Sequence, residues 1–414
     1  MMTKDFMSLK RKSYKEILFW VLLVAIAFSF VWRLSLVTQP GHKGDFSTSL
    51  FWLQKLENPL TEFYKTTGSN YGPLYCLFLS PQKFPIDFLI NRGVDTTTAQ
   101  WMVFHIILII FDLLIVLGIY FLIKRYTKHD LTALTAAALY ALNPIFYYAA
   151  GQWGQADNTV FLSFLIVFWL LLNEKYIYVF PVLALSILFK PTGIVLIPFI
   201  FLIMVFEKKY LSIVFGTIIS LLMIFLFSLP FFGLHIGEMV NYYAETLLRN
   251  NITPQLAVGA KSLWFLFGER RPDSMNFLGL SAKNIGFILL AIVSLLAAWL
   301  SRKNANRFLG LSLGFFVVLF GFYFLPTRSH ERYQLFSFLP LIFLIIENRT
   351  RIWASILYFL STITFALVIL GIYTNSPVFQ KVALQGNAIS IANLLIFLAG
   401  LVLLWYYSAD ERRS

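Results

Sequence analysis

The densest group of chemically active side chains in the sequence is the stretch 326–333, which reads PTRSHERY. Two arginines, a histidine and a glutamate fall within five positions, in a short connection that opens an apolar segment. A helix N-terminus flanked by guanidinium and imidazole groups is well suited to binding a phosphate. The alternative is a solvated turn in which Glu331 favours the positive end of the helix dipole.

A second stretch, 151–157, reads GQWGQAD and contains no lysine or arginine. The Gln155 carboxamide and the Asp157 carboxylate can hydrogen-bond sugar hydroxyl groups, while the indole face of Trp153 can cover a sugar ring. The alternative makes Trp153 an interfacial anchor and Asp157 a cap on the next helix. Asp157 can do both, so the two interpretations stay open.

Asp45 follows the first apolar segment, at the end of the flexible stretch GHKGD (41–45). The neighbouring glycines allow a substrate phosphate or backbone to approach closely. One hypothesis is therefore that Asp45 acts as a general base at the membrane interface. The other is that it is a helix N-cap or a solvated loop carboxylate.

Ionisable residues also interrupt apolar segments. Lys190 lies where two apolar runs meet, and a lysine at membrane depth usually has a partner or an anionic ligand; the alternative is that it snorkels to the interface. Asp112 lies in the middle of an apolar run, and His105 lies seven residues earlier on roughly the same helical face. We interpret Asp112 and His105 as a polar contact between helices.

The elements that must position these residues are membrane-spanning helices. The chain has 414 residues, of which 59% are hydrophobic and 13% charged, whereas a soluble protein carries roughly a quarter charged residues. Apolar runs of about 20 residues, the length that crosses a bilayer, recur along the chain. The pattern predicts an all-α polytopic membrane protein, one integral domain over 1–414, with about 10–12 transmembrane helices.

Candidate spans are the segments 15–37, 100–123, 131–149, 158–173, 176–189, 191–206, 210–230, 283–300, 308–325, 333–346, 352–372 and 387–408. The two short ones, 176–189 and 191–206, meet at Lys190-Pro191. They can instead form a broken or re-entrant hairpin, which is tolerated where protein or water covers the backbone.

The basic residues predict the orientation of the chain. With a cytoplasmic N-terminus, the inner segments are 1–14, 124–130, 174–175, 207–209, 301–307, 347–351 and 409–414. Together with Lys15 they hold more than half of the 33 lysines and arginines, as the positive-inside rule requires. We therefore expect both termini in the cytoplasm and the polar stretches described above on the outer face.

Two outer loops, 38–99 and 231–282, are too long to be simple connections. The first contains a predicted amphipathic helix over 46–57. The second has aromatic residues at roughly helical spacing over 236–249 and 257–268. Because amphipathic helices rich in Trp and Phe lie at membrane interfaces, we expect these loops to do the same.

Several classes of site are absent from the sequence. Cys76 is the single cysteine, which excludes an intramolecular disulfide and a cysteine-based metal site. No Walker loop, dinucleotide fingerprint or HExxH motif is present. The net charge of +13 is divided among many short loops without an aromatic-interleaved patch, so we expect no nucleic-acid partner.

In their order along the chain, these stretches resemble the polytopic glycosyltransferases of the GT-C fold, and more narrowly the bacterial relatives of the second mannosyltransferase of GPI-anchor synthesis. The resemblance spans nearly the whole chain. Its motifs are Asp45, Phe63-Tyr64, Tyr71 with Pro73 and Tyr75, Asn143-Pro144, Trp153-Gly154-Gln155 with Asp157, Phe189-Lys190-Pro191 and His330-Glu331-Arg332-Tyr333. The distinctive motifs are the one from Trp153 to Asp157 and the one from His330 to Tyr333. The order and spacing of all the motifs make the combination fairly specific.

The resemblance implies a GT-C-like bundle that transfers a sugar, mannose or a similar hexose, from a polyprenyl-phosphate carrier with inversion on the non-cytoplasmic face. It implies that Asp45 is the catalytic base. The donor phosphate would be bound by Lys190, His330 and Arg332. The sugar or acceptor would be bound by Trp153, Gln155, Asp157, Tyr71 and Glu331.

The implied partners are the polyprenyl-phosphate-linked sugar, membrane lipids, and a glycan, lipid or protein acceptor, and the implied location is a bacterial plasma membrane. The sequence departs from the family in two places. Some relatives carry paired acids in the first loop, whereas Gly44 leaves Asp45 single, so a divalent metal stays an open question. Relatives often have Asn-Leu-Trp in the second large loop, where this chain has Ser262-Leu263-Trp264 after Lys261.

A competing hypothesis is a transporter or lipid flippase in which Asp112, His105 and Lys190 form a relay at the bilayer midplane. Transporters usually have repeated halves with matching broken helices, and this sequence offers one candidate break. A third hypothesis is another membrane transferase or polymerase that handles surface polysaccharide.

Overall fold

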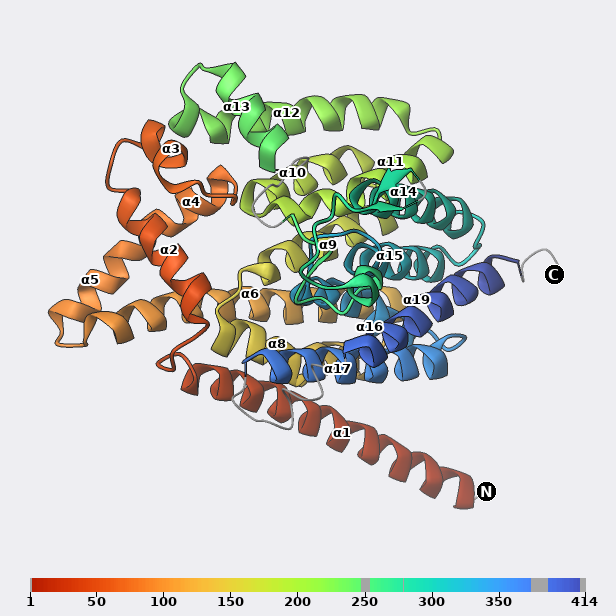
Figure 1. Cartoon of the computed structure of the whole chain (residues 1–414). Helices are drawn as coiled ribbons and strands as arrows, with labels where there is room; N and C mark the ends of the chain where they lie inside the picture. Colours follow the sequence, from red (N-terminus) through yellow and green to blue (C-terminus); the bar gives the residue numbers. More distant parts are fainter. Residues whose placement is uncertain (1, 247–253, 278, 374–385, 410–414) are drawn as a thin grey trace. The chain divides into compact units, whose positions relative to one another are not determined.

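A computed structural model describes residues 2–246, 254–277, 279–373 and 386–409. Most of the described residues are helical, and their strands are two residues long (Figure 1). Among the described helices, seven are long and apolar enough to cross a membrane: α1, α6, α12, α14, α15, α17 and α19. The prediction of an all-α polytopic membrane protein is therefore confirmed.

The helices are α1 (Met2–Ser35), α2 (Lys43–Lys55), α3 (Phe63–Thr67), α4 (Pro73–Leu79), α5 (Lys83–Asn91), α6 (Thr96–Thr127), α7 (Asp130–Ala141), α8 (Pro144–Tyr148), α9 (Asp157–Leu172), α10 (Val179–Phe189), α11 (Ile197–Phe206), α12 (Tyr210–Phe232), α13 (Ile236–Ala244), α14 (Ala282–Ser301), α15 (Arg307–Phe324), α16 (Phe338–Ile346), α17 (Arg351–Tyr373) and α19 (Gly386–Ala409). Each predicted span falls on one or two of them. The strands are β1 (Ala257–Val258), β2 (Asn276–Phe277), β3 (Leu280–Ser281) and β4 (Ser329–His330).

The predicted span 131–149 is interrupted. Helix α7 ends at Ala141, and α8 begins at Pro144. The Asn143 side chain accepts a hydrogen bond from the Ile145 amide and caps the new helix, while Pro144 occupies a first-turn position where its missing N–H costs nothing. The Asn-Pro pair thus ends one helix and starts the next.

The break predicted at Lys190 is present. Lys190 has an extended backbone (φ −149°, ψ 131°) between α10 and a 3-10 turn, η5 (Pro191–Leu196), which leads into α11. An extended conformation is what a residue before proline prefers. Gly193 permits the tight turn, since a Cβ there would lie 2.5 Å from the Ser186 Oγ.

The chain forms two compact units. Unit 1 comprises 1–59, 65–67 and 75–165, and unit 2 comprises 60–64, 68–74 and 166–414. In unit 1, α7 packs against both α6 and α1. In unit 2, α15 is the core helix: 89% of its apolar window is buried, and α14, α16 and α19 pack around it. A helix that is apolar on all sides lies in a protein core or faces lipid, and α15 is covered by other helices.

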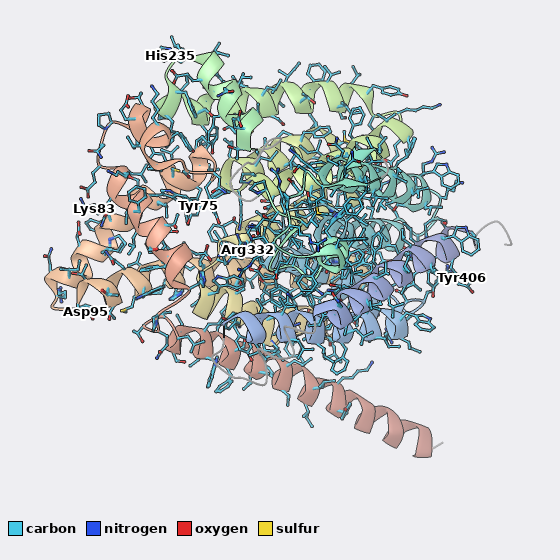
Figure 2. All side chains as sticks on the ribbon, viewed as in Figure 1. Tyr75, Lys83, Asp95, His235, Arg332 and Tyr406 are labelled. Carbon is cyan, nitrogen blue, oxygen red and sulfur yellow. The ribbon has the colours of Figure 1, made fainter. Side chains whose placement is uncertain are left out.

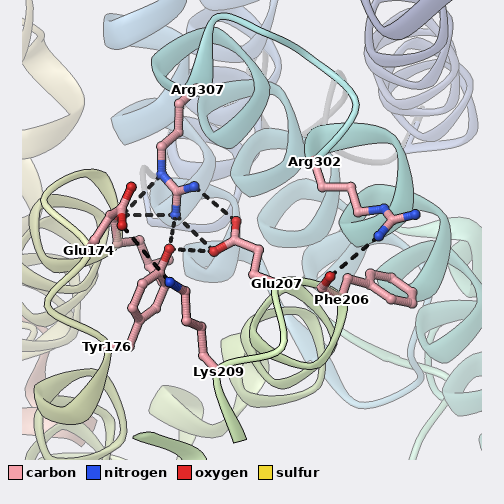
Figure 3. Close-up of polar contacts among 8 residues, drawn as sticks. Glu174, Tyr176, Phe206, Glu207, Lys209, Arg302 and Arg307 are labelled. Carbon is pink, nitrogen blue, oxygen red and sulfur yellow. Dashed lines mark hydrogen bonds and ion pairs between the residues drawn. The ribbon is translucent and has the colours of Figure 1, made fainter.

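One end of unit 2 joins three of the predicted inner segments (Figure 3). Arg307 donates to Glu207 Oε1 at 2.9 Å and to the Tyr176 hydroxyl at 2.7 Å, and Lys209 lies 4.0 Å from the Glu174 carboxylate. The segments 174–175, 207–209 and 301–307 therefore share one end of the unit, as the charge pattern requires.

The large outer loops differ in part from expectation. The predicted helix over 236–249 is confirmed as α13 over Ile236–Ala244; residues 247–249 lie outside the described part. The stretch 257–268 is not an α-helix, which corrects the prediction: it contains β1 and a 3-10 turn, η7 (Leu263–Phe267). Gly259 (φ 77°) and Gly268 (φ 115°) explain the difference, because positive φ angles break a helix.

Candidate functional site

Asp45 lies in the first turn of α2 and not in a flexible loop, which corrects the expectation for 41–45. The helix begins at Lys43, and His42 is its N-cap: the Asp45 amide donates to His42 Nδ1 at 3.3 Å. An acidic side chain in a first helical turn is stabilised by the helix dipole. Asp45 is therefore held on a rigid element while its side chain stays 35% exposed.

The Asp45 carboxylate meets the 151–157 stretch within unit 1. Trp153 Nε1 donates to Asp45 Oδ2 at 2.9 Å, and Gln155 Nε2 donates to the same oxygen. His42 Nδ1 lies 3.0 Å from Oδ2. That nitrogen carries either a lone pair, which accepts from the Asp45 amide, or a proton, which bonds to the carboxylate, so these two His42 contacts are alternatives.

A tight turn aims Trp153 and Gln155 at Asp45. Residues Ala149–Trp153 form a π-helical turn that ends at Gly154, whose φ is 79°. A Cβ at Gly154 would lie 3.3 Å from His105 Nε2. The buried His105 ring is fixed below by a contact of its Nδ1 with the Val37 carbonyl at 3.2 Å. Glycine thus suits this position for both its conformation and its lack of a side chain.

Asp112 makes polar contacts between helices, as its interpretation required. Its carboxylate lies 3.2 Å from Arg33 Nε of α1 and accepts the Tyr140 hydroxyl of α7 at 2.7 Å. Arg33 is fully buried and also donates to the Ala141 carbonyl. His105 contacts Val37 instead of Asp112. The Arg33–Asp112–Tyr140 group therefore ties three helices of unit 1 together.

Lys190 and Tyr71 come together in unit 2. The Lys190 ammonium lies 5.3 Å from the centre of the Tyr71 ring, a cation–π distance. The Tyr71 carbonyl accepts hydrogen bonds from two hydroxyl groups, those of Tyr64 at 3.0 Å and Tyr242 at 2.7 Å. Gly72 packs directly on α10, because a Cβ there would lie 2.2 Å from the Leu188 carbonyl oxygen.

The stretch 328–332 is held as a short strand followed by a 3-10 turn, η8 (Glu331–Ser337). Strand β4 pairs in parallel with β1. Arg328, with φ at 60°, donates to the Asp273 carboxylate at 2.5 Å, so it is a structural residue of this loop. Arg332 Nη1 lies 3.8 Å from Glu331 Oε1, and Figure 2 shows Arg332 among the closely spaced side chains of unit 2.

His330 is electrostatically linked to the cations of this site. Burial, and then the positive charges of Arg332 and Lys190, hold the pKa of the His330 imidazole well below its ordinary value. His330 is consequently neutral at physiological pH. It can donate or accept a hydrogen bond there, but it adds no positive charge.

Lys261 is a functional candidate that sequence reasoning did not place in the site. It is 4% exposed, with its ammonium 3.9 Å from Glu269 Oε2. Burial lowers the pKa of the Lys261 ammonium, and the Glu269 and Glu331 carboxylates oppose that shift. The sequence signal was a lysine in an outer loop, against the positive-inside trend.

The predicted site residues thus form two groups. Asp45, Trp153 and Gln155 contact one another in unit 1, where Asp157 is the buried first residue of α9. Unit 2 holds the others, which are Tyr71, Lys190, His330, Glu331 and Arg332. Within the described residues, no three His, Cys, Asp or Glu side chains are placed to hold a metal ion. Asp45 Oδ2 already accepts hydrogen bonds from Trp153 and Gln155. These bonds suit a carboxylate that acts as a base better than one that binds a metal ion.

Comparison with known proteins gives no family for this chain. No protein-family model matches it, and a search of curated proteins found no significant match. Its function is therefore inferred from the residues themselves.

Proposed function

We propose that this multi-pass membrane protein is an inverting glycosyltransferase that moves a sugar, mannose or a similar hexose, from a polyprenyl-phosphate donor to an acceptor hydroxyl. The observation that carries the proposal is the Asp45 carboxylate, partly exposed on a helix and oriented by the indole of Trp153 and the carboxamide of Gln155. The resemblance to GT-C glycosyltransferases agrees with it.

The reaction needs one base and one site for the leaving phosphate. Asp45 takes the proton of the acceptor hydroxyl as that oxygen bonds to C1 of the sugar, and the bond between C1 and the lipid phosphate breaks with its electron pair on the phosphate. Attack from the face opposite the leaving group inverts C1. Hydrogen bonds to Asp45 Oδ2 set the direction of the whole carboxylate, and a positioned base contributes about 10²–10⁴-fold.

The leaving phosphate is assigned to the cations of unit 2. Lys190 and Arg332 are mostly buried and both act on His330. Buried cations at membrane depth favour an anionic ligand, and preorganised charges stabilise a departing phosphate without reorganisation. Neutral His330 supplies a hydrogen bond, and Lys261 is a further candidate cation.

The proposal places the chemistry on the non-cytoplasmic face of a bacterial plasma membrane, with both termini in the cytoplasm. The support is the charge pattern: segments 174–175, 207–209 and 301–307 are basic and share one end of unit 2. The bilayer also explains a lipid-borne donor, because such a donor reaches its site by lateral diffusion and needs no nucleotide-binding domain.

The transporter hypothesis has less support. Its relay used Asp112, which is tied to Arg33 and Tyr140 in a buried group. Removing one partner from such a pair is strongly unfavourable, so Asp112 is suited to holding helices and not to exchanging protons during transport.

The decisive experiment substitutes Asp45→Asn and measures sugar transfer from a polyprenyl-phosphate-linked hexose in detergent. We expect a loss of about 10²–10⁴-fold, since asparagine keeps the shape and cannot accept the proton. Asp87→Asn, an exposed carboxylate of unit 1 on α5, is the matched control and should retain full activity. Trp153→Phe, which removes the indole donor to Asp45, should lose about tenfold.

Full activity of the Asp45→Asn protein would show that Asp45 is not the base. Solute uptake by reconstituted vesicles, together with no sugar transfer by the unaltered protein, would favour the transporter instead.

A further inference from the structure

Helix α13 leaves the end of a membrane span at a sharp turn. Helix α12 ends at Phe232, Gly233 has a φ of 56°, and α13 begins at Ile236. Helix α13 crosses and contacts the end of α12 (Figure 1), and Figure 2 places His235 at the turn between them. Chain continuity therefore puts α13 at the level where α12 emerges from the bilayer.

The residues of α13 divide into three faces at about 100° per residue. One face is apolar and exposed: Ile236 is 57% and Val240 58% exposed, and Leu234 just before the helix is 79% exposed. A second face is polar and exposed, with Glu238 and Asn241. The third face is packed inward and carries Tyr242.

The apolar face has an identifiable occupant. Helix α12 is a candidate span with only 17% of its apolar window buried, and its exposed residues, such as Leu211 and Leu226, face lipid. Leu234, Ile236 and Val240 add further exposed apolar side chains just after the end of α12 at Phe232. A helix with one lipid-facing side and one water-facing side lies in the membrane interface, so acyl chains cover Ile236 and Val240.

The packed face leads to the phosphate site. Tyr242 donates to the Tyr71 carbonyl at 2.7 Å, and the Tyr71 ring lies 5.3 Å from the Lys190 ammonium. Tyr64 donates to the same carbonyl and packs its ring on Tyr242, with centroids 4.3 Å apart. Two contacts therefore connect a helix at the bilayer surface to a buried cation.

We propose that α13 lies in the membrane interface with acyl chains on its Ile236–Val240 face, and that Tyr242 is a positioning residue which holds Tyr71 and Lys190 at the depth where a lipid-borne phosphate arrives. The second half of this inference rests on the proposed glycosyltransferase function. The first half concerns the membrane alone and is tested without activity.

The membrane contact is tested with nitroxide labels in proteoliposomes. Ile236→Cys and Asn241→Cys are labelled separately; the native Cys76 is fully buried, which limits background labelling. We expect the label at 236 to collide with oxygen several-fold more than with a water-soluble nickel complex, and the label at 241 to show the reverse. Equal exposure of both labels to nickel would overturn the interfacial placement.

The positioning of Tyr71 and Lys190 by Tyr242 is tested by Tyr242→Phe, which removes the hydroxyl that donates to the Tyr71 carbonyl. We expect the KM for a long-chain polyprenyl-phosphate donor to rise about 3–10-fold with kcat unchanged. Tyr243→Phe is the matched control, because that hydroxyl contacts Ser228 at 2.9 Å instead. Ile236→Ser should raise the KM for the long-chain donor and not for a short-chain, water-soluble one.

An unchanged KM in the Tyr242→Phe protein would overturn the coupling while leaving the interfacial placement intact. If the unaltered protein transfers no sugar, the proposed function fails, and the nitroxide measurements still decide whether α13 lies in the interface.

Discussion

The cations at the two ends of unit 2 differ in how closely they pair with carboxylates. At the end drawn in Figure 3, Arg307 and Lys209 are balanced by Glu207 and Glu174, and Arg307 bonds to carboxylate, phenol and backbone oxygens. At the His330 end, three mostly buried cations, Lys190, Lys261 and Arg332, accompany two carboxylates, Glu269 and Glu331. Their ion-pair distances are 3.8 and 3.9 Å.

This difference separates a structural cluster from a binding site. A cation that already pairs with a carboxylate, as Arg307 does with Glu207 at 2.9 Å, holds helices together and gains little from a ligand. Buried cations favour an anionic ligand, and we assign that role to Lys190, Lys261 and Arg332. The following substitutions test the contrast in order of expected effect.

The largest effect is expected from Arg328→Gln, which separates structural from ligand-binding arginines within one loop. Its loss leaves the Asp273 carboxylate, 5% exposed, without its guanidinium partner, and breaking such a pair costs about 3 kcal/mol. Thermal unfolding in detergent measures the change. Arg270→Gln, an exposed neighbour, is the control and should stay within about 0.5 kcal/mol. Equal stability of the two variants would contradict the structural role of Arg328.

Arg332→Gln should instead weaken donor binding. Removing a charged hydrogen bond to phosphate costs about 1.5–3 kcal/mol, or roughly 10–100-fold in affinity. We expect little loss of stability, because the contact between Arg332 Nη1 and Glu331 Oε1 is long, at 3.8 Å. Binding of a polyprenyl-phosphate sugar by calorimetry measures the effect, with Arg270→Gln again as the control. Unchanged affinity would count against the phosphate assignment.

The pH dependence of His330 tests the electrostatic part of the contrast. Because the folded pKa lies well below the ordinary value of about 6.5, the unfolded chain binds more protons in that window. Stability therefore falls as pH drops from about 6.5 towards the folded pKa, by up to about 1.4 kcal/mol per pH unit. Unfolding midpoints at pH 8, 6.5 and 5 measure it. A His330→Asn protein should lose less stability over this range, and an identical fall in both proteins would refute the assignment.

Most of the fold could be predicted from the sequence, because lipid imposes long apolar runs and paired backbone groups. Seven of the twelve predicted spans fall on described helices that are long and apolar enough to cross a membrane. The Lys190-Pro191 pair indicates the break between α10 and η5. Interruptions that depend on capping were harder. Apolar composition alone places the Asn143-Pro144 junction in the middle of one span, whereas the Asn143 side chain caps a new helix there.

The candidate site was predictable where one short motif carries it. Trp153 and Gln155 are two residues apart in a single turn, and both reach Asp45. His42 and Lys261 were missed for different reasons. Histidine is not a common N-cap residue, so 41–45 was read as a flexible loop. The position of Lys261 near His330 depends on the β1–β4 pairing of segments about 70 residues apart. Local sequence patterns do not encode such a contact.

The smallest effect is expected at the end of unit 2 drawn in Figure 3, from Tyr176→Phe. The hydroxyl accepts from Arg307 Nη2 at 2.7 Å and donates to Glu207, so its removal costs about 0.5–1.5 kcal/mol of stability. The Arg307–Glu207 pair at 2.9 Å remains, which keeps the loss small. Tyr178→Phe, in the same 3-10 turn but 56% exposed, is the matched control and should have no measurable effect. Donor affinity should be unchanged in both variants; if Tyr176→Phe weakened donor binding as much as Arg332→Gln, the two ends of unit 2 would not be functionally distinct.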